Sequence, residues 1–177
     1  VIVATCFFKP NPMNHLLITP LLLLSLFSLF ISPAAMSSTA MAEATVSYEV
    51  DGLSADAQII VDEYGVPHIY ADDHYDVFFV QGFNAARDRL WQIDLWKRRG
   101  LGQLAEILGE QHVAQDKAAR LFVYRGDMYA EWLAYGNDAK RITESFTAGI
   151  NAFVAVAKAN PELMPIEFDM LGYAPSM

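Results

Sequence analysis

Apolar residues recur at steps of three and four from Tyr75 to Ile93, which is the spacing of one face of a long helix. Two short extended runs, residues 58–62 and 66–71, precede this helix and flank Gly65, a pattern that predicts a β-hairpin. An isolated hairpin is only marginally stable in water, so its apolar residues need a larger sheet. The chain is therefore predicted to have an α+β fold. The apolar face of the helix consists of Tyr75, Phe79, Phe83, Ala86, Leu90 and Ile93.

The two ends of this helix carry recognisable signals. Asp72 and Asp73 provide a good N-cap. The basic residues 97–99 lie where the helix dipole favours positive charge, and Gly100 is expected to end the helix. The same three bases have a second interpretation as an anion-binding patch. Upstream of the hairpin, the polar residues 47–54 are either a first strand or a linker.

Three further helical segments are predicted. The first covers residues 103–108 and ends at Gly109, the second covers residues 116–135, and the third lies between an Asn137-Asp138 cap and Asn160-Pro161. Residues 163–177 contain Pro165 and Pro175 and are predicted to form a loop-like crossover. The second segment is rich in aromatic side chains, which either pack against the rest of the domain or line a ligand pocket. These aromatics are Phe122, Tyr124, Tyr129, Trp132 and Tyr135.

The first 42 residues have the composition of an export leader. Residues 16–31 are sixteen apolar or small residues in a row, shorter than the roughly twenty that a membrane-spanning helix needs. Ala40-Met41-Ala42 has the small-x-small form that a signal peptidase accepts, so cleavage is expected after Ala42. Met13 is the first candidate initiator. We therefore divide the chain into a signal peptide with upstream residues, 1–42, and an exported part, 43–177. The alternative is an uncleaved anchor, and either one places the protein in the periplasm or outside the cell.

Charge and cysteine content exclude several classes of function. Residues 43–177 hold 21 acidic and 11 basic side chains, because the twelfth base is Lys9. Such an acidic domain repels phosphate backbones, so nucleic acid is not an expected partner. The single cysteine, Cys6, allows no disulfide framework and no cysteine-based metal site. Contact with a membrane is expected only through the leader. The four histidines have no metal-ligand spacing and are interpreted as surface or capping residues: His15, His68, His74 and His112.

A search of residues 43–177 for catalytic patterns finds none. No serine lies in a small-x-Ser-x-small turn, and Gly100-Leu101-Gly102 follows a helix where a dinucleotide fingerprint follows a strand. The carboxylates of Asp72, Asp73 and Asp76 lack the spacing of a calcium loop and are assigned to capping. Residues 87–89, with an acid between two arginines, are interpreted as a charge network that fixes the helix to a neighbour, and a substrate role is the alternative. The serines examined are Ser47, Ser54, Ser145 and Ser176.

A series of motifs in one register over residues 58–175 resembles the opening of the penicillin acylase (penicillin amidase) family. Arg87 is one departure, since glutamine is common there. The motifs that carry the resemblance are Asp62-Glu63-Tyr64-Gly65-Val66-Pro67-His68-Ile69-Tyr70-Ala71, Gln81-Gly82-Phe83, Ala86-Arg87-Asp88-Arg89-Leu90-Trp91-Gln92, Arg98-Arg99, Gly102-Gln103-Leu104-Ala105-Glu106-Ile107-Leu108-Gly109, Asp116, Arg120, Glu167-Phe168, Leu171-Gly172-Tyr173 and Pro175.

The resemblance implies an N-terminal-nucleophile hydrolase with an αββα sandwich fold, of which this chain is the N-terminal, α-chain part: a β-hairpin followed by about four mainly helical segments. The family is made as an exported precursor, a zymogen that cuts itself. The freed N-terminal Ser of its β-chain then attacks an amide, with its own α-amine as base. The implied partners are the β-chain of the same precursor and a small acyl-amide substrate, of the penicillin, cephalosporin or acyl-homoserine lactone type.

The same resemblance places the nucleophile, the oxyanion-hole Asn and the calcium ligands of the complete enzyme after Met177. We therefore assign no catalytic, cofactor-binding or metal-binding residue in this chain, and we expect the chain alone to be inactive. Calcium is expected only in the complete enzyme. The alternative hypothesis is a non-catalytic, envelope-associated interaction protein derived from such an enzyme, with its aromatic helical surface as the binding face.

Overall fold

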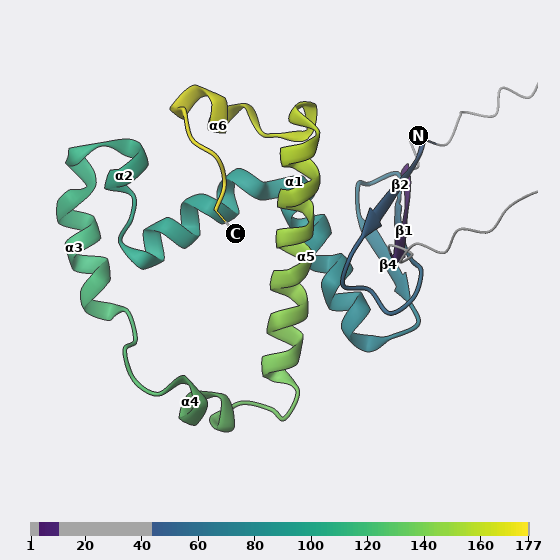
Figure 1. Ribbon diagram of the computed structural model, residues 1–177, viewed down its shortest axis with the longest axis horizontal. Helices are drawn as coiled ribbons and strands as arrows, with labels where there is room; N and C mark the ends of the chain where they lie inside the picture. Colours follow the sequence, from purple (N-terminus) through teal and green to yellow (C-terminus); the bar gives the residue numbers. More distant parts are fainter. Residues whose placement is uncertain (1–3, 11–43, 177) are drawn as a thin grey trace, which may run out of the picture.

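The computed structural model describes residues 4–10 and 44–176, which form a small sheet packed on one side of a helical assembly (Figure 1). The apolar run 16–31 and the cleavage site after Ala42 lie outside the described residues, so the leader stays a prediction. Among the described helices, none combines the length and apolar character needed to cross a membrane. The elements are β1 (Ala4–Pro10), β2 (Ala44–Val50), β3 (Ala57–Val61), β4 (Pro67–Ala71), α1 (His74–Leu101), α2 (Ala105–Leu108), η1 (Glu110–His112), α3 (Val113–Phe122), α4 (Met128–Ala134), α5 (Ala139–Ala159), η2 (Pro161–Leu163) and α6 (Ile166–Leu171).

The sheet has four strands in the order β2-β1-β3-β4. The predicted hairpin is confirmed as the antiparallel pair β3–β4, with Gly65 in the left-handed region at the turn (φ 79°). Within the polar segment 47–54, the strand interpretation holds as far as Val50, the last residue of β2. The fourth strand is β1, which runs parallel to β2 and antiparallel to β3. Sequence analysis places its residues, 4–10, upstream of the leader and assigns them no strand.

The core lies between one face of the sheet and the helix pair α1 and α5. Phe83 on α1 is its centre, because its ring contacts the rings of Phe8, Tyr48 and Phe153 at centroid distances of 4.8, 5.0 and 5.3 Å. These four aromatics come from β1, β2, α1 and α5, so the packing ties all four elements together. The predicted apolar face of α1 is confirmed, since Phe79, Phe83, Ala86 and Leu90 are all buried.

Helices α1 and α5 cross at very short distance through two glycines. A Cβ atom added at Gly82 would collide with the carbonyl oxygen of Phe146, and one at Gly149 would collide with that of Phe79. Each glycine therefore faces the backbone of the opposite helix. This crossing holds α5 against α1 over the sheet (Figure 1).

The helix ends partly differ from prediction. Asp73 caps α1 as expected, accepting hydrogen bonds from the backbone N–H of Tyr75 and Asp76 at 2.8 and 3.3 Å. The expected stop at Gly100 is wrong, because α1 continues to Leu101 and ends at Gly102, whose φ of 67° forms a left-handed C-cap. Gly102 is the better stop since its N–H bonds the carbonyls of the last helical turn.

Two of the later segments also need correction. The single helix predicted over 116–135 is two helices, α3 and α4, because Asp127 leaves the helical region and its carboxylate caps α4 through the N–H of Tyr129 at 2.9 Å. The tail predicted as a loop, residues 163–177, contains the helix α6. Pro165 precedes α6 and Gly172, in the left-handed region (φ 69°), ends it, so the proline that suggested a loop marks a helix start.

Candidate functional site

The turn of the β3–β4 hairpin is organised by the carboxylate of Asp62. Its Oδ1 accepts hydrogen bonds from the N–H groups of Tyr64 and Val66, both at 2.9 Å, and its Oδ2 lies 3.1 Å from Nε2 of His68. The hydrogen bond from His68 and those from the two backbone groups lower the pKa of Asp62 below its ordinary value. The first motif of the series therefore contains a turn in which the Asp62 carboxylate is satisfied by groups of the same hairpin.

The turn is expected to loosen in acid. Because the folded pKa of Asp62 is depressed, its stabilising effect is present above the unfolded pKa, about 4, and is lost as pH falls through the folded pKa. Amide hydrogen exchange at Tyr64 and Val66, referenced to an unstructured peptide, should therefore speed up below about pH 4. In Asp62→Asn, exchange should be faster at neutral pH and should show no such step, and a step of equal size in the variant would contradict the assignment.

Asp73 and Asp76, two of the carboxylates considered as a cation site, accept hydrogen bonds from backbone N–H groups. Asp76 is buried and accepts hydrogen bonds from the N–H of Ser54 (3.1 Å to Oδ2), the hydroxyl of Ser54 (2.6 Å) and the N–H of Ala55 (3.2 Å). Asp73 caps α1. The assignment of this group to capping thus holds for Asp73, whereas Asp76 anchors the β2–β3 loop to α1. Over residues 4–10 and 44–176, no cluster of three or more His, Cys, Asp or Glu could hold a metal ion.

The acid flanked by arginines, residues 87–89, connects α1 to the sheet. Arg87 bonds Asp88 through Nε at 3.1 Å and reaches Sγ of Cys6 on β1 through Nη1, also at 3.1 Å. Arg89 is exposed and lies at a kink in α1 (φ −143°, ψ 28°). The predicted network that fixes the helix to a neighbour is therefore present for Arg87 and does not include Arg89.

A cluster of five residues from α1, α2 and the C-terminal segment, here called the Asp94 cluster, surrounds the buried carboxylate of Asp94. Oδ2 of Asp94 accepts from Nε of Arg98 at 2.7 Å and from the hydroxyl of Tyr173 at 3.1 Å, and Arg98 continues to Glu106 at 3.2 Å. The guanidinium of Arg98 lies over the Tyr173 ring. Burial and the neighbouring Asp94 carboxylate raise the pKa of the Tyr173 hydroxyl, so it stays protonated and donates. The fifth member, Lys97, lies 3.5 Å from Oδ1 of Asp94.

This geometry decides between the two interpretations of the basic residues 97–99. Arg98 is 8% exposed and its hydrogen bonds go to Asp94 and Glu106. Arg99 lies over the ring of Trp96. The bases therefore hold the end of α1 in place, and the structure does not support an anion-binding patch. Sequence analysis missed Asp94; its signal is the spacing of four between Asp94 and Arg98 on one helix.

Asp116 plays a similar structural role on α3. Its carboxylate accepts from the N–H of Leu104 at 3.0 Å and of Ala105 at 2.7 Å, which caps the short helix α2. One turn later, Nε of Arg120 donates to the carbonyl of Gly102 at 2.9 Å. Two residues that carry the family resemblance thus dock α3 onto the end of α1.

Removing this cap should have a measurable cost. Asp116→Ala leaves two backbone N–H groups without their acceptor in a buried site, and we expect a loss of about 1–2 kcal/mol in the free energy of unfolding. Chemical denaturation of the variant and the wild type measures it. The control is Lys117→Ala at the next, exposed position, which should change stability by less than about 0.5 kcal/mol. Equal effects of the two variants would show that the cap contributes nothing.

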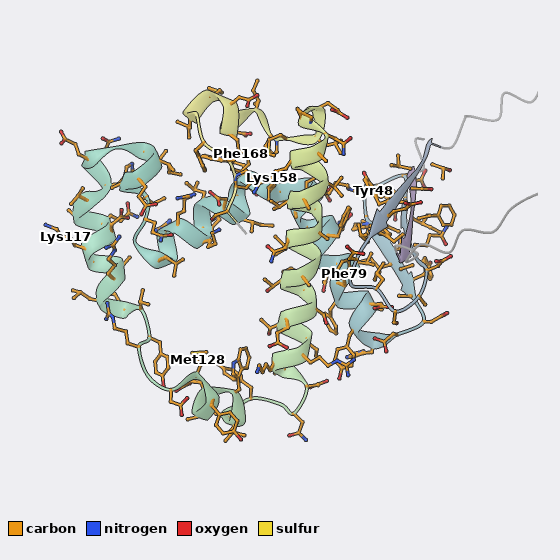
Figure 2. All side chains as sticks on the ribbon, viewed as in Figure 1. Tyr48, Phe79, Lys117, Met128, Lys158 and Phe168 are labelled. Atoms are coloured by element: carbon orange, nitrogen blue, oxygen red, sulfur yellow. The ribbon has the colours of Figure 1, made fainter. Side chains whose placement is uncertain are left out.

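The aromatic side chains within residues 121–136, here called the aromatic arm, do not pack against the rest of the domain. Phe122 and Tyr129 are 89% and 71% exposed, and Tyr124 and Tyr135 are exposed as well, so the expected packing is wrong. Trp132 and Tyr135 contact each other at a centroid distance of 5.8 Å beside an open hollow of about 420 Å³. Figure 2 shows Met128 on the segment that carries the aromatic arm. Met128 lies far from Phe79 and Tyr48, which lie where the helices meet the sheet.

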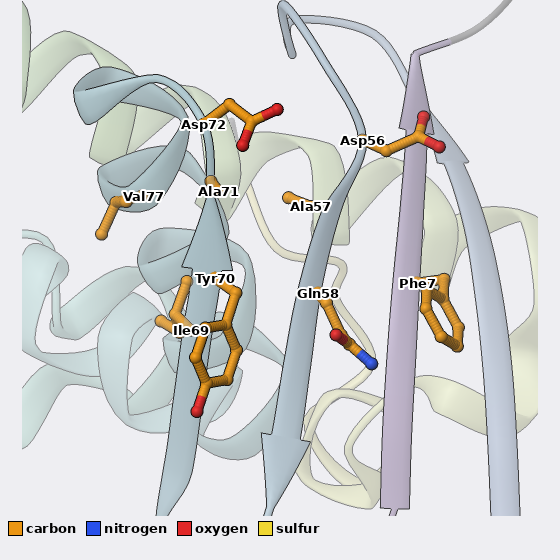
Figure 3. Close-up of a pocket in the computed structure, with 9 residues that line it drawn as sticks. All are labelled: Phe7, Asp56, Ala57, Gln58, Ile69, Tyr70, Ala71, Asp72 and Val77. Carbon is orange, nitrogen blue, oxygen red and sulfur yellow. The ribbon is translucent and has the colours of Figure 1, made fainter.

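The face of the sheet turned away from the helices is also uncovered. Phe7, Gln58 and Tyr70 stand side by side on β1, β3 and β4, over an open hollow of about 540 Å³ with Asp56 and Asp72 near one end (Figure 3). Phe7 and Tyr70 are both exposed. The residues lining this hollow do not place a nucleophile beside a base.

The described part of the chain is thus an α+β scaffold whose buried polar residues hold elements together. Comparison with known proteins agrees with this fold class. The chain belongs to the penicillin amidase family, whose model, described as "Penicillin amidase", matches residues 56–177.

The family is supported by individual relatives. The chain is 35% identical over 123 residues to Penicillin G acylase of Escherichia coli, covering 69% of this chain and 14% of that protein. It is also 35% identical over 129 residues to Penicillin acylase 2 proenzyme of Pseudomonas sp. (strain SE83), covering 73% and 16%. Acyl-homoserine lactone acylase QuiP of Pseudomonas aeruginosa is 25% identical over 126 residues, covering 71% and 14%. The chain therefore spans only about one seventh of the length of these relatives.

A solved structure confirms the fold. The thermostable Penicillin G acylase from Alcaligenes faecalis superposes with a TM-score of 0.62 at 30% sequence identity, over 68% of this chain and 64% of that chain. The expected fold class, an α+β part of the N-terminal-nucleophile hydrolase fold, is therefore confirmed.

Proposed function

We propose that the protein carrying this chain is an exported amidohydrolase that cleaves the amide of small acylated amines, releasing a carboxylic acid and an amine. The observation that carries the proposal is the family match over residues 56–177, in one register with the motifs of the sequence. Relatives named as penicillin acylases and as acyl-homoserine lactone acylases share this reaction class, because both names describe removal of an acyl group from an amine.

In this proposal the described residues form part of the scaffold, and the catalytic residues lie in another part of the protein. The nucleophile is an N-terminal Ser freed by autoproteolysis, and its α-amine takes up the proton of the hydroxyl during attack on the amide carbonyl. The β-chain that carries it is the proposed partner, in keeping with a relative named as a proenzyme. Calcium, where present, is proposed to bind that other part of the protein and to stabilise the assembly.

The uncovered surfaces of the scaffold favour such a partner. The aromatic arm and the outer face of the sheet expose large apolar side chains on two separate parts of the molecule. Exposed apolar patches of this kind mark interaction sites or cause aggregation. A β-chain that covers them would remove this surface from water. The same exposed aromatics are what the alternative function, a non-catalytic interaction protein of the cell envelope, would use.

The proposal is tested on the full-length protein, expressed with its leader. We expect two chains on a denaturing gel, an exported N-terminus at Glu43, and release of acid from either penicillin G or a long-chain acyl-homoserine lactone. The two substrates separate aromatic from fatty acyl preference. A full-length protein that is exported and folded but remains one chain, and releases acid from neither substrate, would favour the interaction protein.

A further inference from the structure

The β3–β4 hairpin carries motif residues that the described fold leaves exposed. Alternation along β4 puts Tyr70 on the opposite face from Ile69, which packs against the core. Tyr70 is 56% exposed, and Tyr64 and Val66 at the turn are exposed as well. All four residues lie in the run 62–71 that carries the family resemblance. Three of them therefore belong to the motif series although much of each side chain lies in water.

An unpaired sheet edge and an open hollow lie beside the same residues. Among the described strands, β4 is the last of the sheet and pairs only with β3. The hollow of about 540 Å³ is lined by residues of β4 and by Val77 of α1 (Figure 3). A strand edge with exposed apolar side chains next to it is a template for pairing with another chain. This region, together with the turn, is here called the β4 surface and consists of Tyr64, Val66, Ile69, Tyr70, Ala71 and Val77.

The motif series distinguishes the β4 surface from the aromatic arm. Both expose large apolar side chains, but the series passes from Arg120 to Glu167 and includes no residue of the arm. Elsewhere in the series, Asp116 and Arg120 make hydrogen bonds within the described part of the chain. Tyr64 and Tyr70 belong to the series without being buried, and exposed aromatic residues that relatives share are typical of binding sites. The partner is then one that members of the family have in common.

What the relatives have in common beyond this region is the rest of the same protein. The matched region makes up only 14% of Penicillin G acylase of Escherichia coli and 16% of Penicillin acylase 2 proenzyme. Most of each relative therefore lies outside the region that this chain matches. A partner from the same protein is also present wherever the chain is made, which a partner from another protein is not.

We propose that the β4 surface binds the β-chain of the proposed function. The inference rests on that function, which supplies a second chain from the same precursor. The docking segment is apolar opposite Tyr70 and carries Lys or Arg at the end of the hollow where Asp56 and Asp72 are exposed (Figure 3). The residues of the β4 surface all lie in the exported part, 43–177, so this surface is independent of the leader. Docking there covers the free edge of β4 and the Tyr70 side chain together.

The test replaces Tyr70 in the full-length protein by the photoreactive residue p-benzoylphenylalanine, which keeps an aromatic ring at this exposed position. After irradiation of the folded protein, mass spectrometry of protease fragments identifies the peptide joined to position 70. We expect an apolar peptide with a lysine or arginine close by, from outside residues 1–177 of the same protein. The control carries the photoreactive residue in place of the exposed Lys117, which lies on α3 far from the sheet (Figure 2). It should not crosslink to that peptide.

A crosslink from position 70 to a second copy of residues 1–177, or no crosslink at all, would overturn the proposal. The wild-type full-length protein gives an independent measurement by hydroxyl-radical footprinting. Oxidation of Tyr70 should be at least about fivefold slower in the native protein than after unfolding, whereas its 56% exposure alone gives about twofold. A difference of only twofold would also overturn the proposal. Neither measurement uses amide hydrolysis or chain cleavage, so an inactive, uncleaved protein would refute the proposed function and leave both readouts intact.

Discussion

Replacing Asp94 by leucine is expected to destabilise the protein by about 3–5 kcal/mol. The substitution leaves the buried Arg98 guanidinium beside an apolar side chain, with the exposed Glu106 as its remaining carboxylate partner. Removing one member of a buried ion pair costs this much because the other charge loses its buried partner. It also removes the acceptor of the Tyr173 hydroxyl, which weakens the attachment of the C-terminal segment to α1. Urea denaturation of wild type and variant measures the difference.

Three further variants separate the parts of the Asp94 cluster. The double variant Asp94→Leu/Arg98→Met should recover most of the loss, because it replaces the whole pair by apolar groups of similar size. Tyr173→Phe removes one hydrogen bond and should cost about 1 kcal/mol, while Lys97→Ala at the half-exposed ion pair should cost less than about 1 kcal/mol. If Asp94→Leu alone costs no more than Lys97→Ala, the cluster does not stabilise the fold.

The features that sequence analysis predicts correctly are those decided by neighbouring residues. The apolar face of α1, the Asp73 cap, the end of α2 at Gly109 and the β3–β4 hairpin each depend on a pattern of a few residues. Short-range periodicity and capping chemistry are therefore enough to predict these elements from a few neighbouring residues.

What the sequence does not predict depends on residues far apart in the chain. The contact of Tyr173 with Asp94 and that of Phe8 with Phe83 have no local signature. The end of the helical run before Asp127 is missed for a different reason. The five aromatic residues around Asp127 suggest one continuous helix, so sequence analysis does not recognise Asp127 as the N-cap of α4. Aromatic content indicates a large apolar surface, but only the tertiary structure decides whether this chain or a partner covers it.

The same distinction explains why the family resemblance identifies the scaffold and names no site. Asp62, Asp116, Arg120 and Tyr173 all belong to the motif series, and in the structure each holds a turn, a cap or a helix end in place. Their contacts are internal to the described residues. The resemblance at these four residues thus reflects contacts that hold the fold together.

Gly149→Ala is expected to destabilise the protein by about 3 kcal/mol, although the same change usually stabilises a helix. Alanine is favoured over glycine in a helix interior by about 1 kcal/mol. At Gly149, however, the new methyl group would overlap the carbonyl group of Phe79 and approach the N–H of Phe83 to 2.8 Å, so α1 and α5 must separate. Separation loosens the core around Phe83 and Phe153. The free-energy cost of this overpacking is larger than the gain in helix propensity from alanine. Thermal or urea unfolding measures the change.

Gly100→Ala is the matched control, because Gly100 also lies within a helix but a Cβ there would meet nothing within 4 Å. With no contact to oppose it, the propensity gain should appear alone, as a stabilisation of up to about 1 kcal/mol. The two variants make the same chemical change and are expected to act with opposite sign. Stabilisation by both would mean that α1 and α5 do not cross at Gly149, and the placement of α5 over the sheet would then be wrong.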